Sequence, residues 1–429
     1  MVAVSVAVKY VVQKMFDAGE YFNSLNMFGI RLGLDAVREL ANRAGNPQEK
    51  LKFIHLAGTN GKGSTGAMLE RAFRAAGFRT GFYTSPHLID IRERFRVNGK
   101  VVAAELFTEM TARLRDAAGD GNFSYFEFAT VLAMQIFARS KCEVVIWETG
   151  MGGRLDATNM VTPAAAVITN IAFDHQGHLG NTLGGIAGEK AGIIKPRVPL
   201  FHGKLPDEAA AVIYERAAAL QSQVFPPRAE VPELTADDAD GQRFTYDGRT
   251  VTLALPGMMQ RENFRIVYEI LCYFAPRWHF DLQTALDGLS QVRWPARFQH
   301  IGARLIVDGG HNPDGVTALT AAVRERYGEE KFTVVYAAFG DKDAAECLPQ
   351  LSRVAKRFVF TNVDVSGRKV FTPEELSAMV NSIPTAAVAE PVAAVETALS
   401  FPERVIVSGS LYLAGEVLAN FAPESAFDL

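Results

Sequence analysis

The sequence has few cysteines, no excess of positive charge and no long apolar run. Cys142, Cys272 and Cys347 are the three cysteines among 429 residues, and their wide spacing is typical of reduced core residues in a cytoplasmic protein. The formal net charge of −4 predicts no surface for nucleic acid. No uncharged apolar run is long enough to span a membrane, and the apolar N-terminus lacks the basic region and cleavage site of a signal peptide. We therefore expect a cytoplasmic protein with small-molecule partners.

Between residues 52 and 202 the chain alternates short apolar runs with helical stretches. The runs are FIHLA, TGFYT, EVVIWE, AAVITNI and VPLFHG. This alternation predicts a parallel sheet with helices on its faces. Residues 222–256 depart from the pattern, and Asp247-Gly248 between alternating residues predicts a hairpin. We expect a small antiparallel excursion there.

The alternating pattern restarts near residues 292–299. Four further strands are predicted within residues 303–310, 331–339, 357–363 and 404–409. The string FTPEEL predicts a helix start, with Thr372 as N-cap, Pro373 in the first turn and Glu375 closing a capping box. The expected fold class is α/β, with an N-terminal domain over residues 1–293 and a Rossmann-like C-terminal domain over residues 294–429.

A glycine-rich loop lies between the first strand and a helical pattern. The string GTNGKGST at residues 58–65 has the strand–loop–helix context of a phosphate cradle, in which backbone N–H groups, the helix dipole and a lysine face an anion. The usual P-loop pattern is not matched literally, because Gly63 separates Lys62 from Ser64. The alternative is a glycine-rich turn with a solvated lysine.

Polar residues follow two of the other predicted strands. Ser85 precedes a proline in a loop expected near the cradle, and Glu148 ends an apolar strand just before several glycines. Because α/β sheets bind ligands at the carboxyl ends of their strands, Glu148 is a candidate Mg²⁺ ligand or water-orienting group. Its alternative role is a capping carboxylate. The alternating Arg92, Arg94 and Arg96 equally fit a solvated strand face.

Two further segments carry histidine and lysine. Asp174 and His175 follow a predicted strand, and His178 lies three residues further on. The cysteine partners or H-E-x-x-H helix of a zinc site are absent from the sequence, so zinc is not favoured. Lys190, in GEKAGIIK, reads by its local sequence alone as a surface lysine.

Taken together, these strings resemble the folylpolyglutamate synthases and dihydrofolate synthases of the Mur ligase superfamily. The resemblance runs from residues 28–34 to residues 409–417 and departs from the family pattern mildly, at Met259 in place of a histidine and at Gly310 in place of an alanine. It rests on HLAGTNGKGST, YTSPHL, YFEFAT, WETGMGGRLDATN, DHQGHLG, GEKAGIIK, RFQ before DGGHNPDG, and SGSLYLAGEV.

The resemblance implies an ATP-dependent ligase that joins a pterin-bearing carboxylate to L-glutamate through an acyl phosphate. It implies an N-terminal P-loop ATP-binding domain, a C-terminal glutamate-ligase domain and an active site in the cleft between them, whose closure excludes water. It implies a monomer with magnesium, and it is compatible with a second magnesium ion and a monovalent cation.

The resemblance also assigns roles to single residues. For the aromatic residues among them, a place in the plain core is the alternative. Catalytic roles fall on Lys62, Lys190 and His175, with Lys190 carbamylated. ATP binding falls on Asn60, Gly61, Lys62, Gly63, Ser64, Asn263, Arg297 and Asp308; magnesium on Ser85, Glu148 and His175; the pterin on Tyr125, Phe126, Glu127, Phe128 and Leu155; and glutamate on His311 and Ser410.

Other classes of protein share part of this pattern. A simple P-loop ATPase or nucleotide switch explains the cradle but not the second domain. A cell-wall or cyanophycin-type Mur ligase shares the ATP chemistry with another acceptor. A non-catalytic nucleotide-binding module leaves Glu148, His175 and Lys190 without a role.

Overall fold

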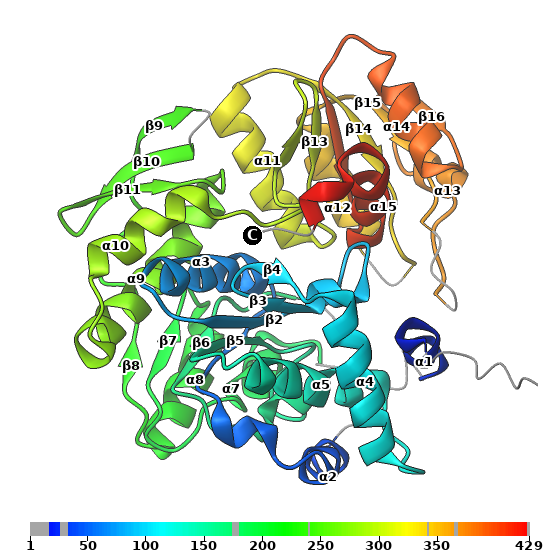
Figure 1. Cartoon of the computed structure of the whole chain (residues 1–429). Coiled ribbons are helices and arrows are strands. Elements are labelled where there is room, and N and C mark those ends of the chain that lie inside the picture. Colours follow the sequence, from blue (N-terminus) through cyan, green and yellow to red (C-terminus); the bar gives the residue numbers. More distant parts are fainter. Residues whose placement is uncertain are drawn as a thin grey trace, which may run out of the picture.

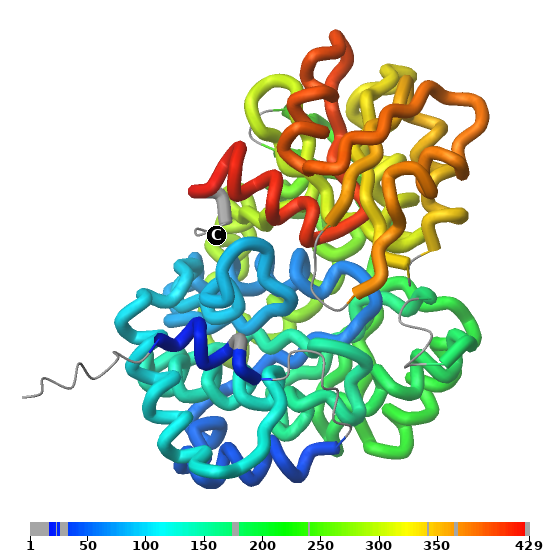
Figure 2. Tube along the Cα trace, turned by 90° about the vertical axis from the view of Figure 1, so that its right-hand side faces the viewer, coloured from blue at the N-terminus to red at the C-terminus, as the bar shows by residue number. Residues whose placement is uncertain are grey.

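In the computed structural model, residues 17–25, 33–173, 180–238, 241–340, 343–363 and 368–426 are described. Within these ranges the chain forms three sheets, of eight, three and six strands (Figure 1). In the view of Figure 2 the blue-to-green part of the tube forms the lower body, and the yellow-to-red part lies above it. The α/β class and the small antiparallel excursion predicted from the sequence are confirmed.

The eight-stranded sheet has the order β4-β3-β2-β5-β1-β6-β7-β8. Its strands are β1 (Phe53–Ala57), β2 (Thr80–Tyr83), β3 (Phe95–Val97), β4 (Lys100–Val101), β5 (Val144–Glu148), β6 (Ala165–Ile168), β7 (Leu200–His202) and β8 (Val224–Phe225). Strands β2, β5, β1, β6, β7 and β8 pair in parallel, whereas β3 and β4 form an antiparallel edge. The central strands are buried throughout, as expected for a parallel sheet covered on both faces.

Helices cover the two faces of this sheet, and alternate residues of each strand pack against the helices on opposite faces. On β1, Ile54 and Leu56 pack with α3 and α9, whereas Phe53 packs with α2, α4 and α5 on the other face. Ala57, at the end of β1, packs with α7 and α8. These helices, with α1 and α10, are α1 (Ala18–Ser24), α2 (Asp35–Arg43), α3 (Lys62–Ala75), α4 (Ala104–Ala118), α5 (Tyr125–Arg139), α7 (Leu183–Ala191), α8 (Asp207–Ala219), α9 (Met258–Trp278) and α10 (Leu282–Asp287). Short 3₁₀ turns are η1 (Pro47–Lys50), η2 (Ile91–Arg94), η3 (Ala157–Met160) and η4 (Gly288–Gln291).

The three-stranded antiparallel sheet contains the predicted hairpin. Its strands are β9 (Leu234–Asp238), β10 (Gly241–Tyr246) and β11 (Arg249–Leu253). Tyr246 pairs with Arg249, and Asp247 and Gly248 between them have φ of 49° and 73°. Positive φ at both central residues is what a tight two-residue hairpin requires, and Asp-Gly tolerates it. The inner face of this sheet packs on α9.

The six-stranded sheet begins beyond residue 293 and has the order β12-β13-β17-β14-β15-β16. Its strands are β12 (Gln299–Ile301), β13 (Leu305–Val307), β14 (Phe332–Tyr336), β15 (Ala355–Phe360), β16 (Thr385–Ala387) and β17 (Val405–Ser408). Only β12 among them pairs antiparallel. Its helices are α11 (Pro313–Tyr327), α12 (Ala344–Ser352), α13 (Pro373–Ala378), α14 (Pro391–Leu399) and α15 (Leu411–Phe421), followed by η5 (Pro423–Ala426). The predicted capping box of Thr372 and Glu375 is present at α13.

No helix in the described ranges combines the length and the apolar composition needed to cross a lipid bilayer.

Gly66 allows α3 to approach the sheet closely. A Cβ at this position would lie 2.5 Å from Cζ of Phe82, on β2. We predict that Gly66→Ala lowers the free energy of unfolding by about 1 kcal/mol or more, because overpacking outweighs the gain of about 1 kcal/mol in helix propensity. Denaturant unfolding of both proteins measures the difference.

Gly188 in α7 provides the matched control for this substitution. It also lies inside a helix, but no atom lies within 4 Å of its ideal Cβ position. Gly188→Ala should therefore raise the free energy of unfolding by up to about 1 kcal/mol. Equal gains in the two variants would show that Gly66 is not required for packing.

Candidate active site

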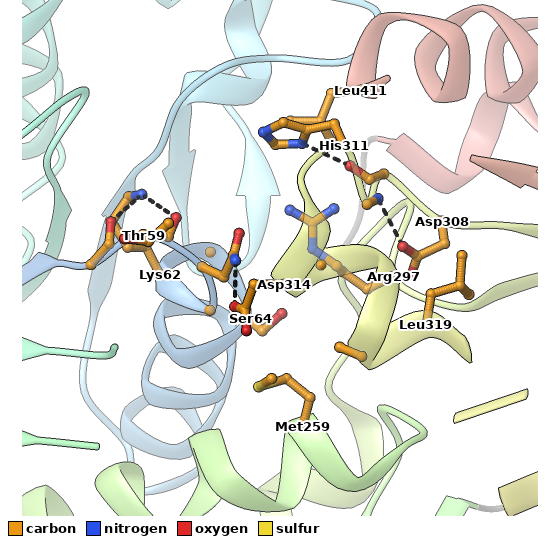
Figure 3. A pocket seen from close by; sticks show the side chains of 18 of the residues that line it. Thr59, Lys62, Ser64, Met259, Arg297, Asp308, His311, Asp314, Leu319 and Leu411 are labelled. Carbon is orange, nitrogen blue, oxygen red and sulfur yellow. Dashed lines mark hydrogen bonds between the residues drawn. The ribbon is translucent and has the colours of Figure 1, made fainter. Parts of the chain in front are cut away.

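One cavity of about 270 Å³ collects most of the residues singled out in the sequence (Figure 3). Its first wall lies at the carboxyl ends of β1, β2 and β5, and its second wall follows β13 and β17 of the six-stranded sheet. Ligands of α/β proteins bind at this end of parallel strands. The predicted residues that line it are Asn60, Gly61, Lys62, Gly63, Ser64, Ser85, Glu148, Lys190, Asn263, Arg297, Asp308, His311 and Ser410.

The glycine loop lies between β1 and the N-terminus of α3, as its sequence predicts. Gly61 is the N-cap residue of α3 and has a φ of 81°. A Cβ at this position would also lie 2.5 Å from Oδ1 of Asn263. The loop therefore requires glycine there both for its backbone conformation and for space. The free N–H groups and positive end of the α3 dipole face the cavity, which is the arrangement that binds phosphate.

Lys62 lies beside the buried carboxylate of Glu148. Its Nζ donates to the carbonyl oxygen of Gly58 at 2.9 Å and lies 4.0 Å from Oε1 of Glu148. Thr84 donates its hydroxyl to the same carboxylate. Burial raises the pKa of the Glu148 carboxyl above its ordinary value, and the Lys62 ammonium partly offsets that shift. The carboxylate is therefore a desolvated negative charge that a further cation would stabilise.

Lys190 is buried at the cavity rather than exposed on the surface. Its side chain belongs to the last turn of α7 and its residue is 3% exposed. The local sequence alone predicted a surface lysine; contact with the cavity wall comes from the way α7 packs on the sheet through Ile186, Ala187 and Ala191. His175, with Asp174 and His178, lies outside the described residues.

The second wall of the cavity is organised by Asp308. Its carboxylate accepts from the backbone N–H groups of Phe298 at 2.9 Å and Gly310 at 2.8 Å. Burial raises the pKa of this carboxyl, and the neighbouring Arg297 guanidinium counteracts the shift. His311 shares a hydrogen bond of 3.0 Å between Nδ1 and the oxygen of Gly309. Asp308 therefore holds together the two loops that present Arg297 and His311 to the cavity.

Ser410 begins α15 at the same wall. Its hydroxyl accepts from the N–H of Tyr412 at 3.1 Å, and the residue is buried. Met259, which stands where the resemblance leads us to expect histidine, also lines the cavity (Figure 3). The first turn of α9, which contains Met259, thus forms part of the site.

The residues expected at the pterin do not line this cavity. Tyr125 and Phe128, both on α5, are buried in the core. The Glu127 carboxylate caps the same helix by accepting hydrogen bonds from the backbone N–H and the hydroxyl of Ser124. Phe126 and Leu155 are half-buried. Phe126 comes nearest, because an ideal Cβ on the cavity residue Gly150 would lie 2.5 Å from its ring.

Several residues of the site were not predicted from the sequence, although Asp314 and Tyr412 lie within the strings that carry the resemblance. Asp314, Arg368 and Tyr412 line the cavity, and Trp294 packs against Gly63 of the cradle. Asp314 lies in the string DGGHNPDG, and its partner Asn60 is 254 residues away. Only the tertiary structure brings such pairs together.

The chain matches two protein-family models. The Mur ligase middle domain matches residues 56–200, and the Mur ligase glutamate ligase domain matches residues 296–411. The first range holds the cradle, Ser85, Glu148 and Lys190, and the second holds Arg297, Asp308, His311 and Ser410. Each model therefore covers one wall of the cavity, and the N-terminal part of α9, with Met259 and Asn263, lies outside both.

Relatives with curated names cover nearly the whole chain. The folylpolyglutamate synthase of Lacticaseibacillus casei is 33% identical over 88% of this chain and 92% of its own. The dihydrofolate synthase/folylpolyglutamate synthase of Bacillus subtilis is 30% identical over 94% of this chain and 97% of its own.

Solved structures agree with these relatives. Mycobacterium tuberculosis folylpolyglutamate synthase complexed with ADP superposes with a TM-score of 0.85 at 26% identity, over 94% of this chain and 97% of that one. Escherichia coli FolC in complex with DHPP and ADP gives a TM-score of 0.83 at 29% identity, over 93% and 95%. With the family models and the cavity, these similarities establish that the chain belongs to the folylpolyglutamate synthase/dihydrofolate synthase family of the Mur ligase superfamily, the ATP-dependent ligases of glutamate.

Proposed function

We propose that the protein uses ATP to join L-glutamate to a pterin-bearing carboxylate, either dihydropteroate, a folate, or both. The observation that carries the proposal is the single cavity, which combines a phosphate cradle, a buried carboxylate and a second wall from the C-terminal sheet. The substrate carboxylate attacks the γ-phosphate of ATP and releases ADP. The amine of glutamate then attacks the acyl phosphate, releasing phosphate and a proton as the amide forms.

The cradle is proposed to bind the ATP phosphates through Gly61, Lys62, Gly63 and Ser64, with Asn60 as the preceding residue of the same loop. Negative charge moves among phosphoryl oxygens in both steps, so fixed N–H groups and an ammonium lower the barrier without reorganising. Asn263, Arg297 and Asp308 line the same cavity and are proposed as further ATP contacts. The Arg297 guanidinium lies near the buried Asp308 and offsets its charge, so that wall is close to neutral, which suits the sugar and base.

Magnesium fits the residues between the cradle and β5. Glu148 supplies a buried carboxylate whose ionised form needs a cation, and the Ser85 hydroxyl lies on the same cavity wall. Oxygen ligands of this kind suit Mg²⁺, which would neutralise phosphate charge when bound. His175 stays a prediction as the third ligand, and a second magnesium ion or a monovalent cation stays compatible with the site.

Carbamylation of Lys190 is part of the proposal. A lysine ammonium beside a magnesium site would repel the metal, whereas a carbamate would attract it. Carbamylation needs the neutral amine, and a buried position in general favours that form of lysine. The modified group would then orient the phosphate end of the site.

The remaining substrates are assigned to the edges of the cavity. His311 and Ser410 are proposed to face the incoming glutamate, since both belong to the C-terminal wall. For the pterin, Phe126 and Leu155 are the half-buried members of the predicted set, with Tyr125, Glu127 and Phe128 behind them. We further propose a boundary between domains near residue 293, a monomeric state and a cytoplasmic location, which suits the free Cys142, Cys272 and Cys347.

Product analysis tests this function. The protein is incubated with ATP, magnesium, L-glutamate and either dihydropteroate or tetrahydrofolate, and the products are identified by mass. Phosphate release should require both L-glutamate and the pterin substrate. Release with ATP alone would instead support a simple ATPase, and product formation with a cell-wall precursor would support another Mur-type ligase.

Lys62→Ala should lower kcat by on the order of 10²-fold or more, because the transferring phosphoryl group loses a positive charge. Steady-state phosphate release measures the effect, and circular dichroism shows whether the fold is retained. Lys356→Ala, at an exposed lysine on β15, is the matched control and should keep full activity. Near-normal turnover of Lys62→Ala would remove the lysine from the mechanism.

Glu148→Gln should lower magnesium-dependent activity while stabilising the metal-free protein. The pKa of Glu148 is raised above 4.5 in the folded state, so the native protein binds more protons than the unfolded chain and loses stability as pH rises through that window. Glutamine removes this dependence. The stability difference between variant and wild type should therefore be largest near pH 7 and vanish below about pH 4.

Denaturant unfolding as a function of pH checks the stability, and activity against magnesium concentration checks the metal. Glu70→Gln is the control, because the Glu70 carboxylate is also buried but lies on α3 and bonds Thr80 and Arg74 away from the cavity. Unchanged magnesium dependence in Glu148→Gln would show that the carboxylate is structural.

Lys190→Ala should be nearly inactive and should recover part of its rate when a small carboxylate such as acetate is added, because acetate replaces the carbamate oxygens. The rate is measured against acetate concentration at constant ionic strength. Lys62→Ala serves as the control. This variant has lost a positive charge, so added acetate should not restore its activity. Full activity of Lys190→Ala would take this residue out of the mechanism.

A further inference from the structure

Four polar side chains connect the phosphate cradle to the first turn of α11. Nδ2 of Asn60 donates to Oδ2 of Asp314 at 2.7 Å and to Oδ1 of Asn312 at 3.2 Å. Nδ2 of Asn312 donates back to Oδ1 of Asn60 at 3.1 Å, and Nδ2 of Asn170 donates to Asp314 at 3.2 Å. Asn60 and Asn170 follow β1 and β6 of the eight-stranded sheet, whereas Asn312 and Asp314 belong to the six-stranded half.

Every hydrogen-bonding group of Asn60 has a protein partner in this arrangement. Its backbone N–H donates to Oδ1 of Asn170 at 2.8 Å, and its carbonyl accepts from the hydroxyl of Thr169 at 2.6 Å. Its side-chain Nδ2 donates to Asn312 and Asp314, and its Oδ1 accepts from Asn312. The side chain of Asn60 is therefore engaged with α11 and not directed to a phosphate.

The charge of Asp314 is unexpected at a phosphate site and needs a reason. The residue lies in the first turn of α11, where the helix dipole stabilises a carboxylate, and it lines the cavity (Figure 3). A carboxylate beside the cradle repels a nucleotide phosphate. In this position the Asp314 carboxylate accepts hydrogen bonds from Asn60 and Asn170. Hydrogen bonds to a charged acceptor are stronger than those to a neutral one, which gives the charge a structural reason.

We infer that Asp314 is a positioning residue, which fixes the cradle through Asn60 and makes nucleotide affinity depend on the docking of α11. This inference rests on the proposed function, since it takes the cradle as the nucleotide site. Asn60 links the two halves of the protein and directly precedes Gly61, so its position sets the position of the phosphate-binding glycines. By thermodynamic linkage, a bound nucleotide must favour the docked helix to the same extent.

A double-mutant cycle on the full-length protein separates this role from simple charge repulsion. ADP affinity in the presence of magnesium is measured by calorimetry for wild type, Asn60→Asp, Asp314→Asn and the double variant. Asn60→Asp places two carboxylates together and should weaken ADP about tenfold, whereas Asp314→Asn alone should weaken it about threefold by losing the charged acceptor. In the Asn60→Asp background, Asp314→Asn should strengthen ADP at least about fivefold, because an amide and a carboxylate again face each other.

The sign of the Asp314→Asn effect decides the question. If Asp314 acts only by its charge, its removal strengthens ADP binding equally in both backgrounds, and that result overturns the inference. Asn60→Ala gives a second test that places no two carboxylates together. Adding Asp314→Asn to this variant should leave ADP affinity unchanged, and an increase in ADP affinity would contradict the positioning role. Unfolding midpoints establish that each variant is folded.

Asp237→Asn is the matched control at the other end of α11. Asp237 lies on β9 and binds Arg326 of α11 at 2.8 Å, away from the cradle. The Asp237→Asn variant should leave ADP affinity unchanged. A loss of ADP affinity equal to that in Asp314→Asn would show that general docking of α11, and not the contact with Asn60, sets the affinity. Absence of ADP binding in the wild type would instead refute the proposed function itself.

Discussion

The close contact between Trp294 and Gly63 is the constraint on which the geometry of the site depends. A Cβ at residue 63 would lie 2.6 Å from Nε1 of the indole, so the cradle and the segment that leads into the second half of the chain touch directly. The indole also packs against the ring of Phe82 at 5.3 Å between centroids, which anchors the connection in the core of the first sheet. The backbone then has positive φ on both sides of Arg297, at 56° and 50°. Such conformations cost a non-glycine residue about 1–2 kcal/mol, and here they accompany a guanidinium that lines the cavity.

The two walls that meet near this contact have similar electrostatics. Each wall contains one carboxylate that burial leaves with a raised pKa, Glu148 on the first and Asp308 on the second, and each carboxylate has one cation beside it, Lys62 or Arg297. Desolvated charges of this kind reduce stability and are characteristic of functional sites. Bringing the walls together places both carboxylates and both cations around one cavity, where the proposed nucleotide and metal would bind.

The predictions were accurate for features that depend on residues close together in the sequence. The Asp247-Gly248 hairpin, the capping box of Thr372 and the strand–loop–helix cradle each depend on residues within one turn, and each is present. Predictions for single side chains were less complete. Lys190 has the local sequence of a surface residue and is buried, and the Asn60 amide bonds α11, because in both cases the deciding neighbours are far away in the chain.

The α/β class, the cradle and the family could be inferred before the structure was known, because apolar periodicity, glycine at constrained positions and the motifs are properties of short segments. Which side chains share the cavity, and what each of them faces, depends on contacts between segments far apart in the chain. Glu148 and Lys62, for example, meet because parallel pairing of β1 and β5 brings their carboxyl ends to one edge. Asn60 and Asp314 meet because the second half of the chain packs across that edge, and no local pattern records a contact of that range.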